Sequence, residues 1–294
     1  MTSSTAVRIF DNHAHANEAT GLGAAEVAKR FKRAGGTGII FVSLLTWSIG
    51  GVPGDRSWVE KLYEHTVKNS EAARAQGLIS GAVVGVHPAE CVKLRESGWG
   101  EDEVEDFMRW TADLAARYVA EGRAVGFGEY GRPHWDAGPD AAALCDRVLE
   151  YVLARARDVG AVVHLHLERR GEETVRSVAE IARRANARPG VVVMHHAEPQ
   201  AAPLAVELGL VPSVPIGRRG ELEEALRLEP IYVVESDYID DNARPGAVIP
   251  PWSLANKIRR AVERGLASES YFEQIYINTE TLYRALLHSS TDNI

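Results

Sequence analysis

Short runs of apolar residues recur along the chain, and longer segments with helical spacing of apolar positions separate them. The runs are rich in β-branched side chains and apolar without alternation, which is typical of parallel strands covered on both faces. We assign eight of them as strands, over residues 8–10, 38–42, 81–86, 124–128, 161–163, 191–194, 210–214 and 231–234. The seventh is the weakest, because Pro212 cannot donate a ladder hydrogen bond within a central strand.

The segments between these strands predict helices. The helix predicted over residues 24–34 ends at a pair of glycines, and the one over 141–159 ends at Gly160. Others are predicted over 102–121, 174–185, 221–228, 253–264 and 279–287. Eight strands alternating with helices predict an α/β fold, a (β/α)8 TIM barrel in a single domain over residues 1–294. No G-x-G-x-x-G motif follows a strand, which removes the main reason to prefer a dinucleotide-binding sheet.

Composition adds constraints on the chemistry and the compartment. A chain of 294 residues can bury a large core without disulfides or structural metals, so a metal here is expected to do chemistry. Cys91 and Cys145 form no C-x-x-C pair and are expected to be small apolar residues in a reduced protein. The first ten residues lack a signal-peptide pattern, and no apolar run approaches the roughly 18 residues that span a bilayer. We therefore expect a cytoplasmic protein without a membrane partner.

The net charge of −8 restricts nucleic-acid partners. An acidic surface repels phosphate backbones, so no broad duplex-DNA-binding surface is expected. A nuclease with a locally positive or metal-lined cleft stays compatible with this charge.

Polar residues follow the predicted strands, where a barrel of this kind carries its catalytic groups. Eight of the ten histidines lie there or in the loop after the fourth strand, and only His65 and His288 lie elsewhere. Buried histidines and carboxylates must be paired or bind a metal, so several strand ends of this composition indicate one metal centre. The candidates are Asp11, His13, His15, His87, Glu129, His164, His166, His195, His196, Glu235 and Asp237.

The spacing of His13 and His15 suits a metal site, because alternate residues of a strand point to the same side. Asp11 either orients one of these histidines or caps the turn. Glu129 lies in Gly126-Phe127-Gly128-Glu129-Tyr130-Gly131, whose glycines permit close backbone approach. Its carboxylate suits a bridge between two metal ions.

Two histidine pairs offer alternative ligands. His166 lies nearer the end of the fifth strand and is the preferred ligand, whereas His164 would lie one layer deeper. After the sixth strand, His195 and His196 would point to opposite sides, and His195 is preferred because it directly follows the apolar run.

The remaining candidates have more than one interpretation. Asp237 suits a metal ligand that also accepts a proton from the attacking water. Glu235 is either its hydrogen-bonding partner or a buried structural acid, and His87 either binds a phosphate or carbonyl oxygen or is structural. Weaker candidates for contacts with an anionic substrate are His134, Arg169 and Arg170.

Together these motifs resemble the TatD-related hydrolases of the amidohydrolase superfamily. The resemblance rests on His13-Ala14-His15, Gly85-Val86-His87-Pro88 and Gly128-Glu129-Tyr130-Gly131, followed in order by the later histidines and Glu235-Ser236-Asp237. Asn278-Thr279-Glu280-Thr281-Leu282-Tyr283 is similar to the family's closing helix. The resemblance covers the chain from Asp11 to Leu287.

The resemblance implies two divalent metal ions, Zn, Mn or Mg. One ion would be surrounded by His13, His15, Glu129 and Asp237, and Glu129 would bridge to a second ion held by His166 and His195. It also implies hydrolysis of phosphoesters, often of DNA, in a small molecule or an oligonucleotide. The metals would lower the pKa of a bridging water, so that hydroxide is available near neutral pH, and Asp237 would take its proton.

The loops expected to touch substrate depart from the family pattern. The usual H-x-R reads His166-Leu167-Glu168, and Cys-Phe-Ser-Gly is replaced by His196-Ala197-Glu198-Pro199. Ser236 stands where the family commonly has threonine. These departures are typical of an archaeal-type branch, and they leave the substrate open.

Three alternatives follow. The first keeps the metal site but acts on a lactone, an amide or another carbonyl compound. The second is a non-catalytic ligand-binding barrel, which the retained ligand set disfavours. The third, the polymerase-and-histidinol-phosphatase barrel, would need more ligands between the first and fourth strands than His87 provides. The strand-4 position offers Glu129 and no lysine, which disfavours the branch with a carbamylated lysine.

Overall fold

One curved parallel sheet organises the chain. The computed structural model describes residues 7–218, 220–243 and 248–287. Within these residues the sheet has the strand order β8-β7-β6-β5-β4-β3-β2-β1-β9, and every pairing is parallel. The strands are β1 (Phe10–His15), β2 (Gly38–Val42), β3 (Ile79–Val84), β4 (Gly126–Gly131), β5 (Val162–His166), β6 (Val192–Met194), β7 (Val211–Pro215), β8 (Val233–Glu235) and β9 (Tyr238–Ile239).

The sheet closes on itself where its last strands meet its first. After β8 the chain passes through Ser236 and Asp237 into β9, which pairs with the end of β1. The backbone N–H of Ser236 donates to Asp11 Oδ1 at 2.9 Å, and the N–H of Asp237 donates to the His13 carbonyl at 3.0 Å. The fold is therefore the predicted TIM barrel in a single domain.

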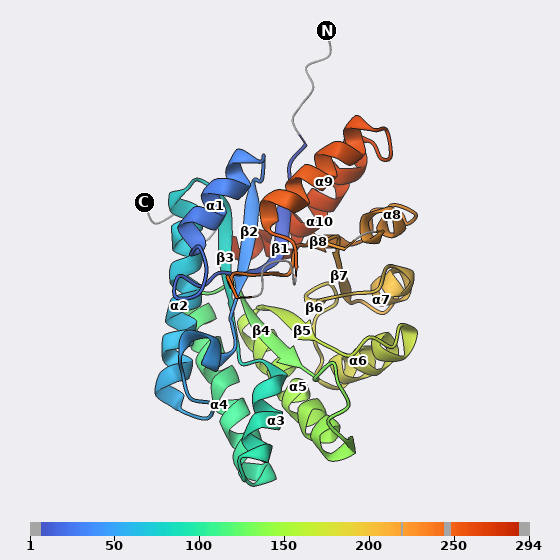
Figure 1. Cartoon of the computed structure of the whole chain (residues 1–294). Helices are drawn as coiled ribbons and strands as arrows, with labels where there is room; N and C mark the ends of the chain where they lie inside the picture. The colour runs from blue at the N-terminus through green and yellow to red at the C-terminus, as the bar shows by residue number, and fades with distance from the viewer. Residues whose placement is uncertain (1–6, 219, 244–247, 288–294) are drawn as a thin grey trace.

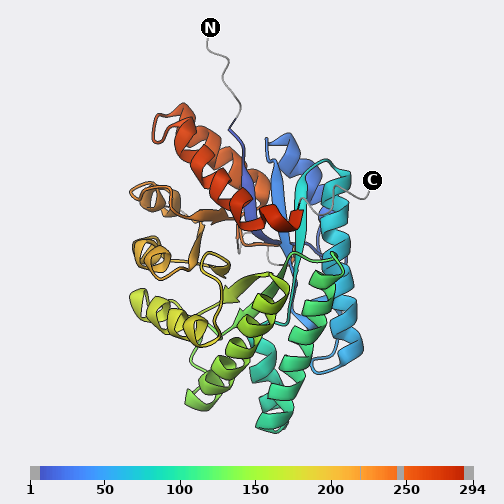
Figure 2. The same ribbon diagram turned by 180° about the vertical axis from the view of Figure 1, so that it is seen from behind.

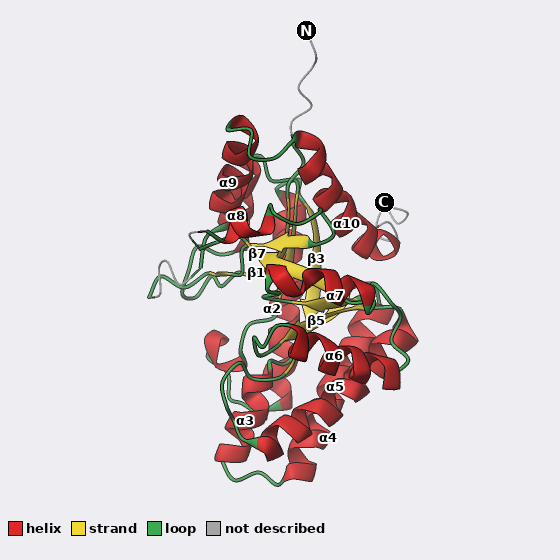
Figure 3. Ribbon diagram, turned by 90° about the vertical axis from the view of Figure 1, so that its right-hand side faces the viewer, coloured by secondary structure: helices red, strands yellow, loops and turns green. Residues whose placement is uncertain are grey.

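Helices surround the barrel, as Figure 1 shows. They are α1 (Ala24–Arg33), α2 (Arg56–Ala75), α3 (Pro88–Glu96), α4 (Glu101–Ala120), α5 (Pro139–Val159), α6 (Glu172–Arg184), α7 (Ala202–Glu207), α8 (Glu221–Ala225), α9 (Pro251–Glu263) and α10 (Glu269–Leu287). Figure 3 shows this layer of helices outside the strands in a side view. The main core lies between the two layers, because each strand buries one face against the helices.

A second, smaller core fills the inside of the barrel. Its aliphatic members come from the strands and the segment before β4: Ile40, Val42, Val83, Val125, Val162 and Val193. Three aromatic residues complete it, Phe10 from β1 and Tyr276 and Tyr283 from α10. Helix α10 therefore covers the end of the barrel opposite the carboxyl ends of the strands, and Figure 2 shows its C-terminal part crossing the sheet there.

Several elements differ from the sequence prediction. Strand β1 continues to His15, so the first two histidines lie within the strand rather than after it. Helix α10 begins at Glu269, ten residues before the predicted start. Helices α2, α3 and α7 were not predicted. Helix α2 buries the polar residues Thr66, Asn69 and Ser70, which weakens its apolar pattern. The loop after β9 includes residues 244–247, which lie outside the described residues.

The seventh strand is present despite its prolines. Pro212 is in register with Met194, but β7 pairs with β6 through only two residue pairs. Its ladder with β8 runs over Ser213, Val214 and Pro215. Pro212 therefore shortens one ladder without excluding the strand.

Both cysteines are buried, as predicted. Among the described residues, no helix has the length and apolar content needed to cross a membrane.

Candidate metal centre

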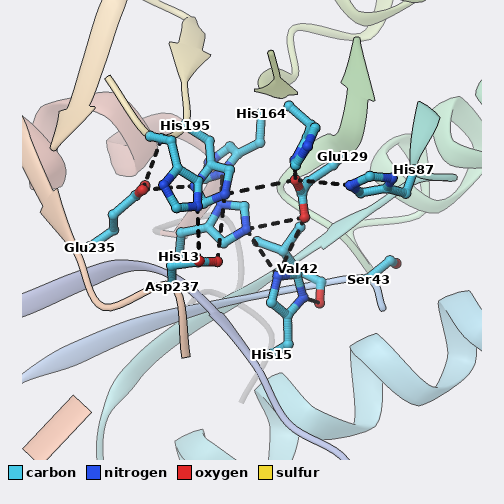
Figure 4. Close-up of polar contacts among 12 residues, drawn as sticks. His13, His15, Val42, Ser43, His87, Glu129, His164, His195, Glu235 and Asp237 are labelled. Atoms are coloured by element: carbon cyan, nitrogen blue, oxygen red, sulfur yellow. Dashed lines mark hydrogen bonds and ion pairs between the residues drawn. The ribbon is translucent and has the colours of Figure 1, made fainter. Parts of the chain in front are cut away.

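The carboxyl ends of the strands bring the predicted polar residues together around Glu129 (Figure 4). This carboxylate is 4% exposed and projects from β4 toward histidines from four other parts of the sheet. Its oxygens lie within 4.0 Å of a nitrogen of five histidines, which are His13, His15, His87, His166 and His195. Glu129 therefore occupies the middle of the site.

Close backbone packing gives Glu129 this position. A Cβ atom added to Gly85 would lie 2.7 Å from the backbone of Gly128, and one added to Gly128 would lie 2.8 Å from the Cβ of His164. Side chains at either glycine would therefore separate β4 from its neighbours.

The first group of potential ligands is formed by His13, His15 and Glu129. The Nε2 atoms of both histidines lie 3.4 Å from Glu129 Oε1 and 3.2 Å from each other. His15 Nδ1 lies 2.9 Å from the carbonyl oxygen of Val42 and must donate to it. The Nε2 of His15 is then left with a free lone pair toward the centre.

His166 joins the centre from the end of β5. Its Nδ1 lies 2.8 Å from Glu129 Oε2, and its Nε2 lies 2.9 Å from His134 Nδ1. His164, two residues earlier, is fully buried and lies deeper, with its Nδ1 3.1 Å from His13 Nδ1. The geometry thus favours His166 over His164 as a ligand, in agreement with the sequence interpretation.

His195 and His196 both approach Asp237, contrary to the expectation that they would point to opposite sides. His195 Nε2 lies 3.5 Å from Asp237 Oδ1, and His196 Nε2 lies 2.8 Å from Asp237 Oδ2. Strand β6 ends at Met194, and His196 has a φ of 57°, so the alternation of an extended strand no longer applies. Together they form a second potential ligand group.

Asp11 and Glu235 support these groups from below. Asp11 Oδ1 accepts from the backbone N–H groups of His13 and Ser236 and contacts no imidazole. This geometry fits the capping interpretation. Glu235 accepts from the backbone N–H of His196 at 2.9 Å, and its Oε1 lies 2.8 Å from His195 Nδ1. That second contact is not a hydrogen bond, and His195 Nδ1 has no hydrogen-bond partner among the described residues.

His87 has a different orientation from the other histidines. Its Nδ1 accepts the backbone N–H of Ala89 at 3.0 Å and so caps helix α3. Burial lowers the pKa of His87 to about 3, which keeps the ring neutral. A neutral imidazole that accepts at Nδ1 carries its proton on Nε2. His87 therefore presents an N–H donor toward Glu129 Oε2, 3.9 Å away, rather than a metal-binding lone pair.

The electrostatics of the centre favour an ionised carboxylate. Burial alone would raise the pKa of Glu129, but the surrounding imidazoles of His13, His15 and His166 hold the pKa well below its usual value. By contrast, burial raises the pKa of Glu235 to about 8. The two buried glutamates are therefore in opposite electrostatic environments.

The donor set fits divalent cations. Imidazole nitrogens and carboxylate oxygens are the ligands of Zn²⁺ in catalytic sites, and their mixture also suits Mn²⁺. Glu129 takes part in two groups of potential ligands, one with His13 and His15 and one with His87 and His166, each within 4.8 Å. In the group with His87 and His166, His166 can supply a lone pair, whereas His87 supplies a proton. A carboxylate shared in this way suits two neighbouring ions.

A cavity of about 510 Å³ opens above the centre. Glu129 and Asp237 contribute its carboxylates, and Arg169 and Arg218 contribute exposed guanidinium groups. Glu168 is held away from it by an ion pair with Arg132 at 2.9 Å. The position where the family pattern has arginine is thus occupied by a residue that faces elsewhere, and its neighbour Arg169 supplies the cation.

A TIM barrel with histidines and carboxylates at the carboxyl ends of its strands defines the class of protein, a metal-dependent hydrolase. The chain matches the family model of the TatD related DNases over residues 10–284 and belongs to this family. The family resemblance inferred from the strand-end motifs is confirmed.

The chain is also similar to individual proteins. An uncharacterized protein of Methanocaldococcus jannaschii is 30% identical over 281 residues, which cover 94% of this chain and 95% of that protein. The crystal structure of a TatD homologue, YjjV of Escherichia coli K12, has a TM-score of 0.63 at 19% identity, covering 95% of this chain and 98% of that one. D-aminoacylase, whose structure is described as defining a subset of amidohydrolases, has a TM-score of 0.58 at 14% identity, covering 95% and 74%.

Three residues beneath the centre escaped the sequence interpretation: Asn12, Ser213 and Tyr283. All three are fully buried. Asn12 lies where the register of β1 shifts, between Asp11 and Ala14, and α10 brings Tyr283 in from the far end of the chain. Two signals were present in the sequence: Asn12 lies between two candidate residues, and Tyr283 ends the segment that resembles the family's closing helix.

Proposed function

We propose that the protein uses two divalent ions to hydrolyse phosphoester bonds in a small molecule or at the end of a single-stranded oligonucleotide. The observation that carries the proposal is the lining of the cavity above Glu129. In a chain with a net charge of −8, this cavity carries Arg169, Arg218 and the N–H donor of His87. Such groups suit the non-bridging oxygens of a phosphate.

The residues of the chain take distinct parts in this reaction. As the family resemblance implies, His13, His15, Glu129 and Asp237 would hold one ion, and Glu129, His166 and His195 the other. When bound, these ions would lower the pKa of a water molecule and neutralise negative charge on the phosphate. Asp237 would accept the proton from the attacking water. Its Oδ1 lies 3.5 Å from His195 Nε2 and its Oδ2 lies 2.8 Å from His196 Nε2. Arg169 and His87 orient the substrate.

The size of the cavity limits the substrate. About 510 Å³ is within the range of roughly 300–1,000 Å³ typical of small-molecule sites. A mononucleotide, an aryl phosphodiester or the end of a single strand suits it better than an intact duplex.

A substrate panel tests the proposal. Purified protein is assayed with aryl phosphodiesters, single-stranded oligonucleotides and lactones, each with Mn²⁺, Zn²⁺ or Mg²⁺. We expect turnover of the phosphoesters that is lost in Asp237→Asn and kept in Asp102→Asn, an exposed aspartate on α4. Turnover of lactones alone would contradict the phosphoester proposal while leaving the hydrolase class intact.

A further inference from the structure

A chain of buried hydrogen bonds runs beneath the metal centre from His13 to Glu235. His13 Nδ1 lies 3.1 Å from His164 Nδ1, and His164 Nε2 lies 2.6 Å from the hydroxyl of Tyr283. That hydroxyl donates to Asn12 Oδ1 at 2.8 Å. The amide of Asn12 donates to Ser213 Oγ at 3.0 Å, and Ser213 donates to Glu235 Oε2 at 2.5 Å.

All six side chains of this buried hydrogen-bond chain are fully buried. It is built from β1, β5, β7, β8 and α10, so that no single element determines it. A buried polar group without a partner is costly, so each member must donate or accept as its neighbour requires.

The hydrogen bonds run in one direction. The amide oxygen of Asn12 faces Tyr283, so the hydroxyl proton of Tyr283 points to Asn12 and only its oxygen lone pairs face His164. His164 must then carry its proton on Nε2 and accept at Nδ1. His13 must in turn carry its proton on Nδ1, which leaves the Nε2 lone pair facing Glu129 Oε1 at 3.4 Å.

We propose that Tyr283 and Asn12 are positioning residues that fix the tautomer of His13, so that its Nε2 is always available to the metal. The inference rests on the metal centre of the proposed function and not on the identity of the substrate. Neither residue touches the cavity or the ions' potential ligand atoms, since both act through His164 and His13.

Without the Tyr283 hydroxyl, the opposite arrangement becomes favourable. His164 would move its proton to Nδ1, because Nε2 would no longer face an acceptor. It would then donate to His13 Nδ1, and His13 would carry its proton on Nε2, directed at Glu129. Binding of a metal ion would have to reverse both tautomers before His13 could coordinate it.

Tyr283→Phe tests this directly, because it removes a single oxygen atom. Tyr276→Phe is the matched control, being the same change in a buried tyrosine of the same helix, outside the hydrogen-bond chain. Two measurements are made: Zn²⁺ and Mn²⁺ affinity by titration calorimetry, and histidine tautomers in the metal-free, ¹⁵N-labelled protein by two-bond ¹H–¹⁵N correlation spectra.

We expect Tyr283→Phe to weaken metal binding by about 10- to 100-fold, the usual effect of removing a partner of a ligand. His164 and His13 should show the proton on Nε2 and Nδ1 in the wild type, and on Nδ1 and Nε2 in the variant. Tyr276→Phe should change neither measurement. Ser213→Ala should keep the wild-type tautomers, because the bond from Tyr283 to Asn12 persists.

Two results would overturn the inference. One is a wild-type protein in which His164 carries its proton on Nδ1. The other is a Tyr283→Phe variant with unchanged tautomers, whether or not its metal affinity falls, since a loss of affinity alone would show a general structural effect. The tautomer measurement needs neither metal nor substrate, so its outcome is independent of the phosphoester proposal.

Discussion

The metal centre has two regions of similar polar composition, a mouth that lines the open cavity and a floor that is fully buried. The mouth is formed by His87, His134, His166, Arg169, His196 and Arg218, which line the open cavity. The floor is formed by residues that are all 0% exposed: Asn12, His164, Ser213, Glu235 and Tyr283. Floor residues bond one another in a single direction, whereas mouth residues present donors or lone pairs to the cavity. Whether a polar residue near a strand end belongs to the floor or to the mouth therefore depends on its hydrogen-bond partners and not on its residue type.

Metal removal should produce the largest difference between the two regions. Chelation with EDTA is expected to abolish activity and to leave the circular dichroism spectrum unchanged, because the floor is held together by protein groups alone. Mn²⁺ or Zn²⁺ should restore turnover. Saturation at 100 times the dissociation constant should raise the unfolding free energy by about 2.7 kcal/mol. A chelated protein that loses its fold would show that the floor depends on the metal.

Asp237→Asn should have the next largest effect. The amide cannot take a proton from the attacking water, so we expect kcat to fall by roughly 10³-fold. Thermal stability should stay near that of the wild type, because an amide oxygen can still face His196. The measurement is steady-state kinetics with elemental analysis of bound metal. If kcat is retained, Asp237 is a ligand only and the proton has another acceptor.

Ser213→Ala tests the floor as a structural unit. The change leaves the Asn12 amide without an acceptor and removes a donor from Glu235. We expect the free energy of unfolding to fall by about 1–3 kcal/mol in urea denaturation. Thr111→Ser, a buried hydroxyl outside the centre that keeps its hydrogen-bonding capacity, is the control. Unchanged stability in Ser213→Ala would mean that the hydrogen bonds of the floor do not stabilise the fold as one unit.

Arg169→Ala tests the mouth. Loss of the guanidinium group should raise KM for a phosphodiester about tenfold, because a charge-assisted hydrogen bond contributes on the order of 1.5–3 kcal/mol when buried and less when exposed. Metal affinity should be unchanged. Arg170→Ala is the control, since Arg170 pairs with Glu173 and does not line this cavity. Equal effects of the two changes would remove Arg169 from substrate binding.

Glu90→Gln gives the smallest expected effect and extends the comparison to a buried carboxylate outside both regions. Glu90 accepts from the backbone and hydroxyl of Thr46, while its Oε2 has no partner. Burial raises the pKa of Glu90 above its ordinary value of 4.5. Because the folded protein holds this proton more tightly, wild-type stability should fall as pH rises above 4.5 toward the folded pKa.

The glutamine variant lacks that pH dependence. At pH 8 it should be more stable than the wild type by about 1 kcal/mol, and near pH 4 the two should be equal. Thermal unfolding over this pH range measures the difference. A wild-type advantage at pH 8 would show that the ionised carboxylate has a partner in solution.

The sequence predicted the fold well because the strand pattern is local. Continuous apolar runs such as residues 38–42 and 191–194 identify buried parallel strands without knowledge of their neighbours. Helix α2 was missed because Thr66, Asn69 and Ser70 lie on its buried side and bond to nearby groups. A helix whose packed face is partly polar has no clear apolar stripe.

The sequence predicted which residues gather at the candidate site, but not the orientation or the hydrogen-bond partners of each one. His13, His15, Glu129, His166 and Asp237 converge as expected, because the carboxyl ends of parallel strands share one edge. The backbone at His196 leaves the extended conformation, so strand alternation gave a wrong orientation for this residue. Tyr283 lies 119 residues beyond its partner His164, and no local pattern links the two.

The closure of the barrel has a consequence for how the protein is made. The floor joins Asn12, from the first strand, to Tyr283, from the last helix, with a sequence separation of 271 residues. Contacts between such distant parts of a chain form late, because the entropy of closing a long loop opposes them. During synthesis, histidines near the amino terminus leave the ribosome long before the residue that sets their tautomer. A complete metal-binding geometry at His13 is therefore among the last features of the molecule to form.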